Sequence, residues 1–346
     1  MNEQRNFILA IGLSILVLLV WQYFIGSSQI DERTTNQPSG ESSVEDNLDL
    51  SNIPLPESDP EGEGKITLAK IESNQNQEDM SVERIRINTD KLEGSISLLG
   101  AKLDDIRLKK YRDTIDADSK LVQLLRPYSS ENPYYAHQGW VSDTKSQTKL
   151  PSDESIWKLV SGNQLSINTP IRIQWNNGEG LIFTKEFSID DNYLFTIKQT
   201  VENNSNSDEI LYPYSLVSRK GLPEDYTNFF VLHEGFIGVI GSEGEKKADY
   251  ADISEQTESF ENIVTGWLGF TDKNWATVIV PPQDISYQGR FTSKGNGSTY
   301  QVDYLGSAQK ISIGSSTTIS SYVFSGAKEV KILDKYEEDY SLEKFD

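Results

Sequence analysis

The first hydrophobic pattern along the chain is an uncharged run of 19 residues from Phe7 to Ile25. At a rise of about 1.5 Å per residue it would form a helix of roughly 28 Å, close to the hydrocarbon thickness of a bilayer. Trp21 and Tyr23 lie near its end, where amphipathic rings favour the membrane interface. The pattern predicts a transmembrane anchor over residues 1–25, with Phe7, Trp21 and Tyr23 in contact with lipid.

Two features bear on how this anchor is used. Arg5 and the amino terminus are the positive charges before the run, which places the amino terminus in the cytoplasm and the rest of the chain outside. The alternative is a cleavable signal peptide, because Gly26-Ser27-Ser28 offers small residues for cleavage. The length of the apolar run favours the anchor, since signal peptides use about 7–15 apolar residues.

Residues 26–80 carry no Phe, Trp or Tyr and contain 13 acidic and 3 basic residues, a net charge of −10. Such a segment cannot bury enough apolar surface to offset its ordering entropy. Repulsion between its charges keeps it extended. We predict an acidic disordered linker over this range.

Period-two alternation of apolar and polar residues begins near Val82 and recurs through most of the chain. Residues 84–87, 171–175, 181–187 and 193–197 alternate in this way, as do shorter runs near 300–304, 311–313 and 322–324. Asn177-Gly178 separates two of these runs and is a strong hairpin signal. The spacing of strands and turns predicts a β-sandwich over residues 81–326.

The carboxyl end changes to helical periodicity. Ala327, Val330, Leu333 and Tyr336 follow one another at intervals of three, and Ser325 precedes them as an expected N-cap. The pattern predicts a short helix within residues 327–346, with Val330, Leu333 and Tyr336 packing on the sandwich.

Composition excludes several classes of site. The formal net charge is −21 and the pI is near 4.5, which opposes nucleic acid as a partner. No cysteine is present, and the two histidines are His137 and His233, so thiolate metal sites and multi-histidine metal sites are not expected. Neither a phosphate-binding glycine loop nor a nucleophile elbow occurs. We therefore predict no catalytic residue, no cofactor and no metal.

Several segments in the same order along the chain resemble the YidC family of bacterial membrane protein insertases, which is related to the Oxa and Alb insertases. The resemblance rests on Gln4-Arg5-Asn6 with the following apolar run to Trp21-Gln22, on Ile87-Asn88-Thr89, on Gly94 to Leu103, on Leu108–Tyr111, on Gly266 to Phe270 with Trp275-Ala-Thr277 and Pro281, and on Tyr322 to Lys328 with Leu333 and Tyr336.

The resemblance implies a fold and a function. The fold is mainly β, a galactose mutarotase-like β-supersandwich in the periplasm, with an N-terminal transmembrane helix and a short C-terminal helix. The family inserts, folds and assembles integral inner-membrane proteins, alone or with the Sec translocon and its accessory subunits. Its partners are nascent membrane proteins and the lipid bilayer, and it is not an enzyme.

The insertase core of the family consists of further transmembrane helices. Residues 327–346 are therefore expected to form an exit helix and the start of the connection to the second transmembrane helix of the protein, which is the first helix of this core. On this interpretation, the chain is the anchor and periplasmic interaction domain of a longer insertase.

Two alternatives remain at this point. A membrane-anchored enzyme or sugar-binding protein with the mutarotase fold would line a cleft with His137, Trp140 and neighbouring tyrosines. A secreted all-β adhesin would have lost residues 1–25 as a signal peptide.

Overall fold

The computed structural model describes Ile53 and residues 83–345, apart from residues 117, 225, 227–232, 256, 296 and 341. The predicted membrane span with Phe7, Trp21 and Tyr23 lies outside the described residues. Every described residue belongs to one compact unit within residues 46–346.

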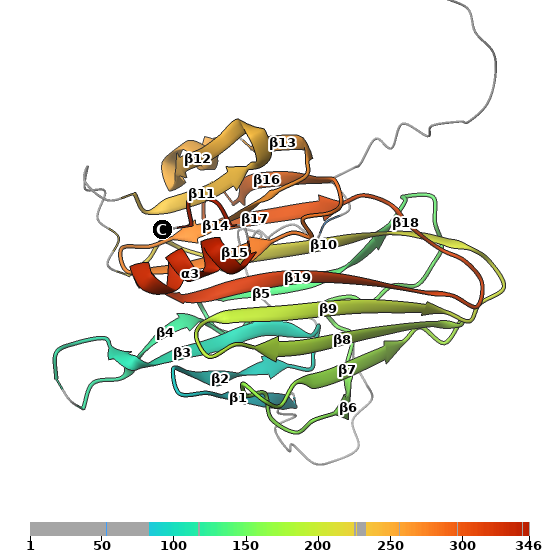
Figure 1. The fold of residues 1–346 in the computed structure, drawn as a ribbon, viewed down its shortest axis with the longest axis horizontal. Helices are drawn as coiled ribbons and strands as arrows, with labels where there is room; N and C mark the ends of the chain where they lie inside the picture. The colour runs from blue at the N-terminus through green and yellow to red at the C-terminus, as the bar shows by residue number, and fades with distance from the viewer. Residues whose placement is uncertain are drawn as a thin grey trace, which may run out of the picture. The chain divides into compact units, whose positions relative to one another are not determined.

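Strands dominate the described part of the chain, with a 3₁₀ turn (η2) and two α-helices (Figure 1). The elements are β1 (Arg84–Asn88), β2 (Leu92–Ser97), β3 (Lys102–Arg112), β4 (Leu121–Leu125), β5 (Tyr134–Ser142), β6 (Lys158–Ser161), β7 (Ile171–Asn176), β8 (Leu181–Ile189), β9 (Leu194–Asn203), β10 (Glu209–Lys220), β11 (Gly235–Ile240), η2 (Gly241–Glu243), β12 (Gly244–Asp249), α2 (Tyr250–Glu255), β13 (Glu258–Ile263), β14 (Gly266–Thr271), β15 (Trp275–Val280), β16 (Tyr287–Lys294), β17 (Thr299–Gly306), β18 (Gln309–Ile311), β19 (Ser316–Ala327) and α3 (Val330–Tyr340).

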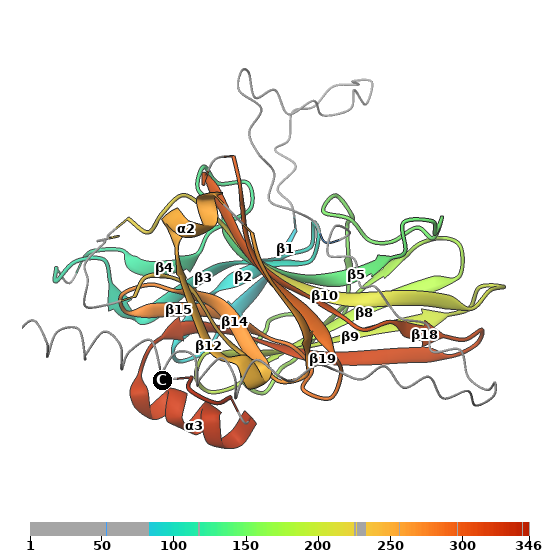
Figure 2. The ribbon, with the colours of Figure 1, turned by 90° about the horizontal axis from the view of Figure 1, so that it is seen from above.

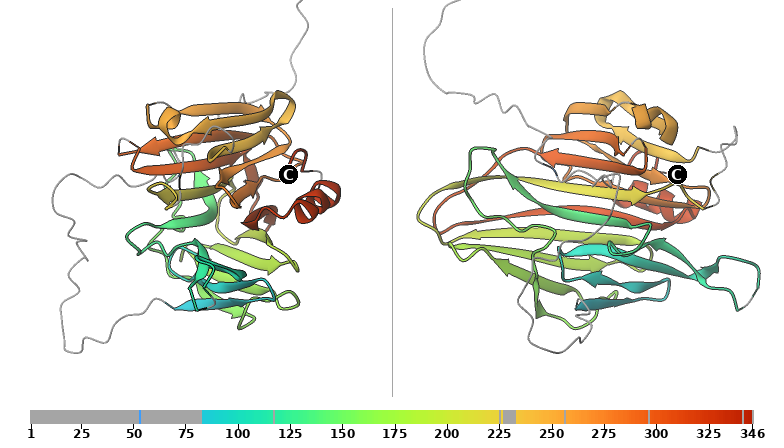
Figure 3. Two further views of the ribbon diagram at one scale, coloured as in Figure 1. Left: turned by 90° about the vertical axis from the view of Figure 1, so that its left-hand side faces the viewer. Right: turned by 180° about the vertical axis from the view of Figure 1, so that it is seen from behind.

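These strands form two large antiparallel sheets. The ten-stranded sheet has the order β1-β2-β3-β5-β10-β17-β16-β13, with β4 paired to β3 and β18 paired to β10. The nine-stranded sheet has the order β12-β11-β14-β15-β19-β9-β8-β7-β6. Figures 2 and 3 show the two sheets as layers, with α3 outside them beside the nine-stranded sheet.

Most of the main core lies between the two sheets and follows directly from the alternation in the sequence; the rest lies beneath α3, where Leu333 and Tyr336 join it. On β8, every second residue from Leu181 to Ile189 is buried. The hairpin predicted at Asn177-Gly178 joins β7 to β8, with Asn176 paired to Ile182. Gly178 has a φ of 80°, a left-handed conformation that glycine adopts without strain.

A β-bulge near the start of β3 turns two adjacent carboxylates to the outer face of the ten-stranded sheet. Ser95 pairs with Asp105 but Ile96 pairs with Leu103, so Asp104 is the extra residue. Leu103 and Ile106 belong to the main core, so both Asp104 and Asp105 point away from it.

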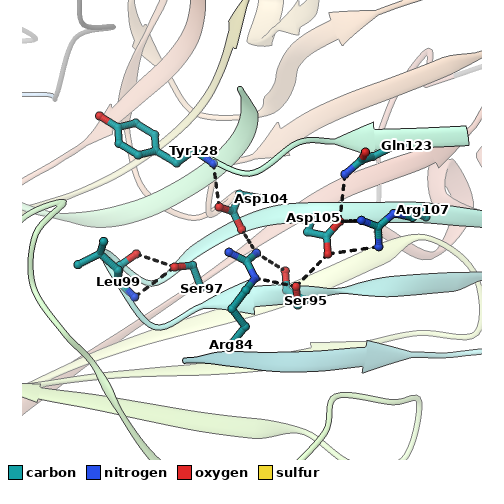
Figure 4. Close-up of polar contacts among 9 residues, drawn as sticks. All are labelled: Arg84, Ser95, Ser97, Leu99, Asp104, Asp105, Arg107, Gln123 and Tyr128. Carbon is teal, nitrogen blue, oxygen red and sulfur yellow. Dashed lines mark hydrogen bonds and ion pairs between the residues drawn. The ribbon is translucent and has the colours of Figure 1, made fainter. Parts of the chain in front are cut away.

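The bulge builds the polar network drawn in Figure 4. Arg84 forms an ion pair with Asp104 and donates a hydrogen bond to the Ser95 hydroxyl at 2.8 Å. Ser95 in turn donates to Asp105 at 2.9 Å, and Asp104 accepts from the backbone N–H of Tyr128 at 3.0 Å. The network ties β1, β2 and β3 to the segment that follows β4.

The predicted carboxyl-terminal helix is present, but its start was wrong. The helix α3 begins at Val330, whereas Ser325 and Ala327 lie in β19, where Ala327 pairs with Trp275 of β15. Pairing with β15 satisfies the backbone of these residues, so Ser325 is not an N-cap.

The mainly β fold with a short C-terminal helix is therefore confirmed. No helix within the described part of the chain is long and apolar enough to cross a bilayer.

Candidate functional site

Helix α3 covers an apolar stripe on the outer face of the nine-stranded sheet. Leu333 and Tyr336 are buried, and the Tyr336 ring packs against Phe324 of β19 with 6.0 Å between ring centroids. Val330 was expected to pack on the sandwich and does not, because its side chain is 62% exposed. Ile332 is buried in its place.

Buried hydroxyl groups fix the position of α3 on the sheet. Tyr336 donates a hydrogen bond to the Asp190 carboxylate at 2.6 Å and accepts one from the backbone N–H of Tyr193 at 3.2 Å. Tyr193 donates to Glu329, just before the helix, at 2.7 Å. Burial and the Asp190 carboxylate raise the pKa of Tyr336, so its hydroxyl remains a donor at neutral pH.

The residues after α3 fold back onto the same face. Phe345 packs edge-on against Trp267 of β14, with 5.1 Å between ring centroids, and against Phe324. The Trp267 indole N–H donates to the backbone carbonyl of Glu343 at 3.0 Å. The carboxyl-terminal segment and α3 are therefore both packed on the same face of the nine-stranded sheet.

An open groove of about 800 Å³ lies beside α3, lined mainly by strands of the nine-stranded sheet and also by Tyr111 and Arg112 at the end of β3. Its apolar lining comes from several elements of the sheet and from the helix. These residues are Ile237, Trp267, Trp275, Ala276, Val278, Phe324, Ala327, Val330, Leu333 and Phe345.

Charged side chains surround this apolar lining. Arg112, Lys247, Lys273 and Lys328 contribute positive charge, and Glu245 and Glu329 contribute negative charge. Burial lowers the pKa of Lys328, whose ammonium group donates to the Thr271 hydroxyl at 2.9 Å. A groove lined by both apolar and charged side chains can receive an extended or helical segment of another protein.

His233 lines this groove but is not placed to act as a base. Its Nε2 lies 2.8 Å from the carbonyl oxygen of Phe236, and its Nδ1 lies 3.4 Å from the Asp249 carboxylate. Both ring nitrogens are therefore engaged by oxygen atoms of the protein. In the described residues, no group of three His, Cys, Asp or Glu side chains lies close enough together to hold a metal ion.

The other histidine, His137, lies in a buried cluster on β5. Its side chain is 8% exposed, with Nδ1 at 3.3 Å from the Tyr214 hydroxyl and 3.9 Å from the Asp153 carboxylate. Asp153 pairs at 2.7 Å with Lys102. Burial, together with Lys185 and Lys102, lowers the pKa of His137, so the ring is neutral at pH 7.

This cluster is closed to a sugar. The cavity that His137 lines measures about 10 Å³, which is room for one water molecule at most. Trp140 lines the same small cavity, so the space that His137 and Trp140 share is too small for a sugar. A neighbouring hollow of about 600 Å³ is lined by Trp140, Asp153 and Tyr214 but not by His137. The sugar cleft of the alternative interpretation is not favoured.

Sequence reasoning missed the charged partners of His137. Lys185 comes from the nine-stranded sheet and donates to the backbone carbonyl of Gln138, while burial lowers its pKa to about 7. Asp153 lies in the loop after β5, far from β8 in the sequence. The sequence offered one signal for this cluster. Lys185 stands at an apolar position of the alternating run 181–187, which indicates a buried charge.

Comparison with known proteins agrees with this architecture. The family model of the YidC periplasmic domain matches residues 84–345. The membrane protein insertase YidC of Methylobacterium radiotolerans is 35% identical over 364 residues, which cover 100% of this chain and 58% of that protein. The membrane protein insertase YidC of Methylobacterium nodulans is 36% identical over 356 residues, again with 100% of this chain and 58% of that protein.

Solved structures with a similar fold include a galactose mutarotase related enzyme from Lactobacillus acidophilus. It has a TM-score of 0.47 and 8% sequence identity, over 70% of this chain and 97% of that chain.

The chain spans 58% of the length of these two curated relatives. The match to the family model covers every described strand and α3, including the face that carries the groove. The chain therefore belongs to the YidC periplasmic domain family.

Proposed function

We propose that the chain is part of a membrane protein insertase and chaperone that assists insertion, folding and assembly of integral inner-membrane proteins. The observation that carries this proposal is the similarity to relatives named membrane protein insertase YidC over the whole of this chain. In this proposal, the chain supplies an anchor and a periplasmic domain that acts by contact and not by catalysis.

The proposed organisation follows the order of the sequence. Residues 1–25 anchor the chain in the inner membrane through Phe7, Trp21 and Tyr23, with the amino terminus in the cytoplasm. Residues 26–80 link the anchor to the β-domain of residues 81–326 in the periplasm. Residues 327–346, with α3, lead toward the rest of the insertase.

The groove beside α3 is the proposed contact surface. Its exposed Val330 and half-buried Trp275 offer apolar contact area, and the lysines and glutamates around them can pair with charges that flank a membrane segment. We propose nascent membrane proteins as the ligands of this surface. The Sec translocon with its accessory subunits, and the lipid bilayer, are the other proposed partners.

A depletion experiment tests the insertase role. Expression of the full protein is repressed in its host, and a newly made single-span inner-membrane protein is followed by pulse labelling and protease accessibility. We expect insertion to fall on depletion and to recover when the protein is expressed again. Unchanged insertion after complete depletion would contradict the proposal.

A variant pair connects the role to the groove. Val330→Asp places a charge on the apolar lining without burying it, and an acidic residue in the first turn suits the helix dipole. Thr318→Asp, at an exposed position of β19, is the matched control. We expect recovery with Thr318→Asp and weaker recovery with Val330→Asp, and equal recovery would exclude the groove as the contact surface.

The enzyme alternative has its own test. The purified protein is assayed for aldose epimerisation and is titrated with galactose and glucose while tryptophan fluorescence is recorded. We expect neither turnover nor a fluorescence change. Epimerisation of either sugar would overturn the proposal that the domain acts by contact.

A further inference from the structure

Ile53 is buried far outside the main core. Its side chain is 1% exposed and belongs to a second, separate hydrophobic cluster. We call this set the Ile53 cluster: its buried members are Ile53, Tyr135, Val141, Tyr214, Leu216 and Leu305, with Tyr128 and Tyr212 packed against it. Ile53 precedes the sandwich by 30 residues, yet its side chain is as deeply buried as a core residue.

The Ile53 cluster lies on the outer face of the ten-stranded sheet. On β5, Tyr134 and Ala136 belong to the main core, so Tyr135 between them points outward. On β10, Val217 faces the main core, and Leu216 beside it faces out. The three contributing strands are neighbours in the order β5-β10-β17 (Figure 1).

Register brings the cluster residues of these strands together. Tyr214 of β10 pairs with Leu305 of β17 on one side and with Gly139 of β5 on the other. A Cβ atom at Gly139 would lie 2.7 Å from the Tyr214 ring, so the ring lies directly over this glycine. The ring, Leu216 and Leu305 form an apolar floor on the strands.

Polar and aromatic contacts hold Tyr128 in place at one side of this apolar surface. The backbone N–H of Tyr128 donates to Asp104, as Figure 4 shows, and the Tyr128 ring meets the Tyr135 ring edge-on with 5.2 Å between centroids. The Lys102 ammonium lies 4.3 Å from the centroid of the Tyr128 ring. These contacts fix the position of the Tyr128 ring beside Tyr135.

An outward-facing sheet surface of this composition needs a cover. The outer face of an antiparallel sheet is usually polar, and contiguous exposed apolar patches mark places where another segment binds. Here the cover is Ile53. Because Pro54 follows it in the sequence, Ile53 is restricted to extended backbone conformations, so little entropy is lost when its side chain is fixed.

We propose that Ile53 attaches the chain that precedes the β-domain to the ten-stranded sheet. Its side chain occupies the apolar site on β5, β10 and β17, on the outer face of that sheet. The site accepts one β-branched aliphatic side chain. Ile53 thereby contacts the sheet that does not carry α3.

Cysteine pairs test the attachment of Ile53 directly, because the chain has no cysteine of its own. Ile53→Cys is combined with Leu305→Cys in the full chain, and the pair is oxidised or treated with a short bis-maleimide. The control combines Ile53→Cys with Thr318→Cys on the exposed outer face of β19 in the other sheet. We expect intramolecular cross-linking of the first pair only. Failure of the first pair with both reagents, or equal yields from both pairs, would overturn the proposal.

A second measurement, amide hydrogen exchange, needs no cysteine substitution at the site. Ile53→Ser removes the apolar contact, and Ile313→Ser, at an exposed isoleucine, is its matched control. We expect amide hydrogen exchange in residues 211–217 and 302–306 to quicken about tenfold with Ile53→Ser and to stay unchanged with Ile313→Ser. Unchanged exchange in both variants would show that Ile53 is not the cover of this site.

Discussion

The docking of α3 can be tested with two substitutions on the same helix. Leu333→Ala removes three carbon atoms from a buried side chain. Losses of this kind cost about 2–5 kcal/mol when the surroundings do not collapse. Since α3 lies at the end of the described chain and packs on the outside of the sheet, the cost falls on the docking of the helix and not on the packing between the two sheets. Val330→Ala changes an exposed side chain and should alter stability by about 0.5 kcal/mol at most.

Hydrogen exchange with mass spectrometry reads this difference locally. A loss of 2 kcal/mol corresponds to amide exchange about 30-fold faster in residues 330–340 of Leu333→Ala. Exchange in β8 and β9 should stay as in the wild type, and Val330→Ala should match the wild type throughout. Tryptophan fluorescence should also change in Leu333→Ala, because detachment uncovers Trp267. If Leu333→Ala exchanged like the wild type, or if Val330→Ala were equally affected, our description of α3 would be wrong.

Three further predictions concern the chemistry that holds the fold. Tyr336→Phe removes the hydroxyl bound to a carboxylate and should lower the free energy of unfolding by about 1.5–3 kcal/mol in urea titrations, with the half-buried Tyr340→Phe as a near-neutral control. Burial lowers the pKa of Lys185 to about 7, so the unfolded chain binds a proton that the folded chain releases above that pH. Stability should therefore rise by roughly 2 kcal/mol from pH 7 to 9, and Lys185→Met should remove this rise in urea titrations across that range. Gly94→Ala would place a Cβ atom 1.9 Å from a backbone oxygen of β3 and should lower the melting temperature much more than Gly178→Ala, which meets no atom within 4 Å and costs about 1 kcal/mol for its left-handed backbone.

The sequence predicted best the features that depend on local periodicity. Alternation along residues 171–175 and 181–187 predicted β7 and β8, because one face of each strand is buried and the other is not. The turn between them needed only the preference of Asn177-Gly178 for a tight hairpin.

Local periodicity failed where strand pairing decided the outcome. Ala327 is at helical spacing from Val330, yet it extends β19 because Trp275 of β15 offers a partner for its backbone. The helix can begin only after that pairing ends. Val330 then falls at the first position of α3 and points away from the sheet, which explains why two of the three predicted packing residues are buried.

The polar clusters were out of reach of sequence reasoning for a related reason. Lys102, His137, Asp153 and Lys185 come from β3, β5, a loop and β8, and only the packing of two sheets brings them together. The bulge at Asp104 likewise has no local sequence signal, since it is defined by the register between β2 and β3. The contact of Ile53 with the ten-stranded sheet is also non-local.

The central claim is that the domain acts by contact through the groove beside α3. A photoreactive phenylalanine analogue placed at Val330 in the membrane-bound protein, with Thr318 as the control position, measures this most directly. We expect irradiation to join a ribosome-bound nascent inner-membrane protein to position 330 and not to position 318. Absence of the adduct at position 330, or equal labelling at both positions, would contradict the claim.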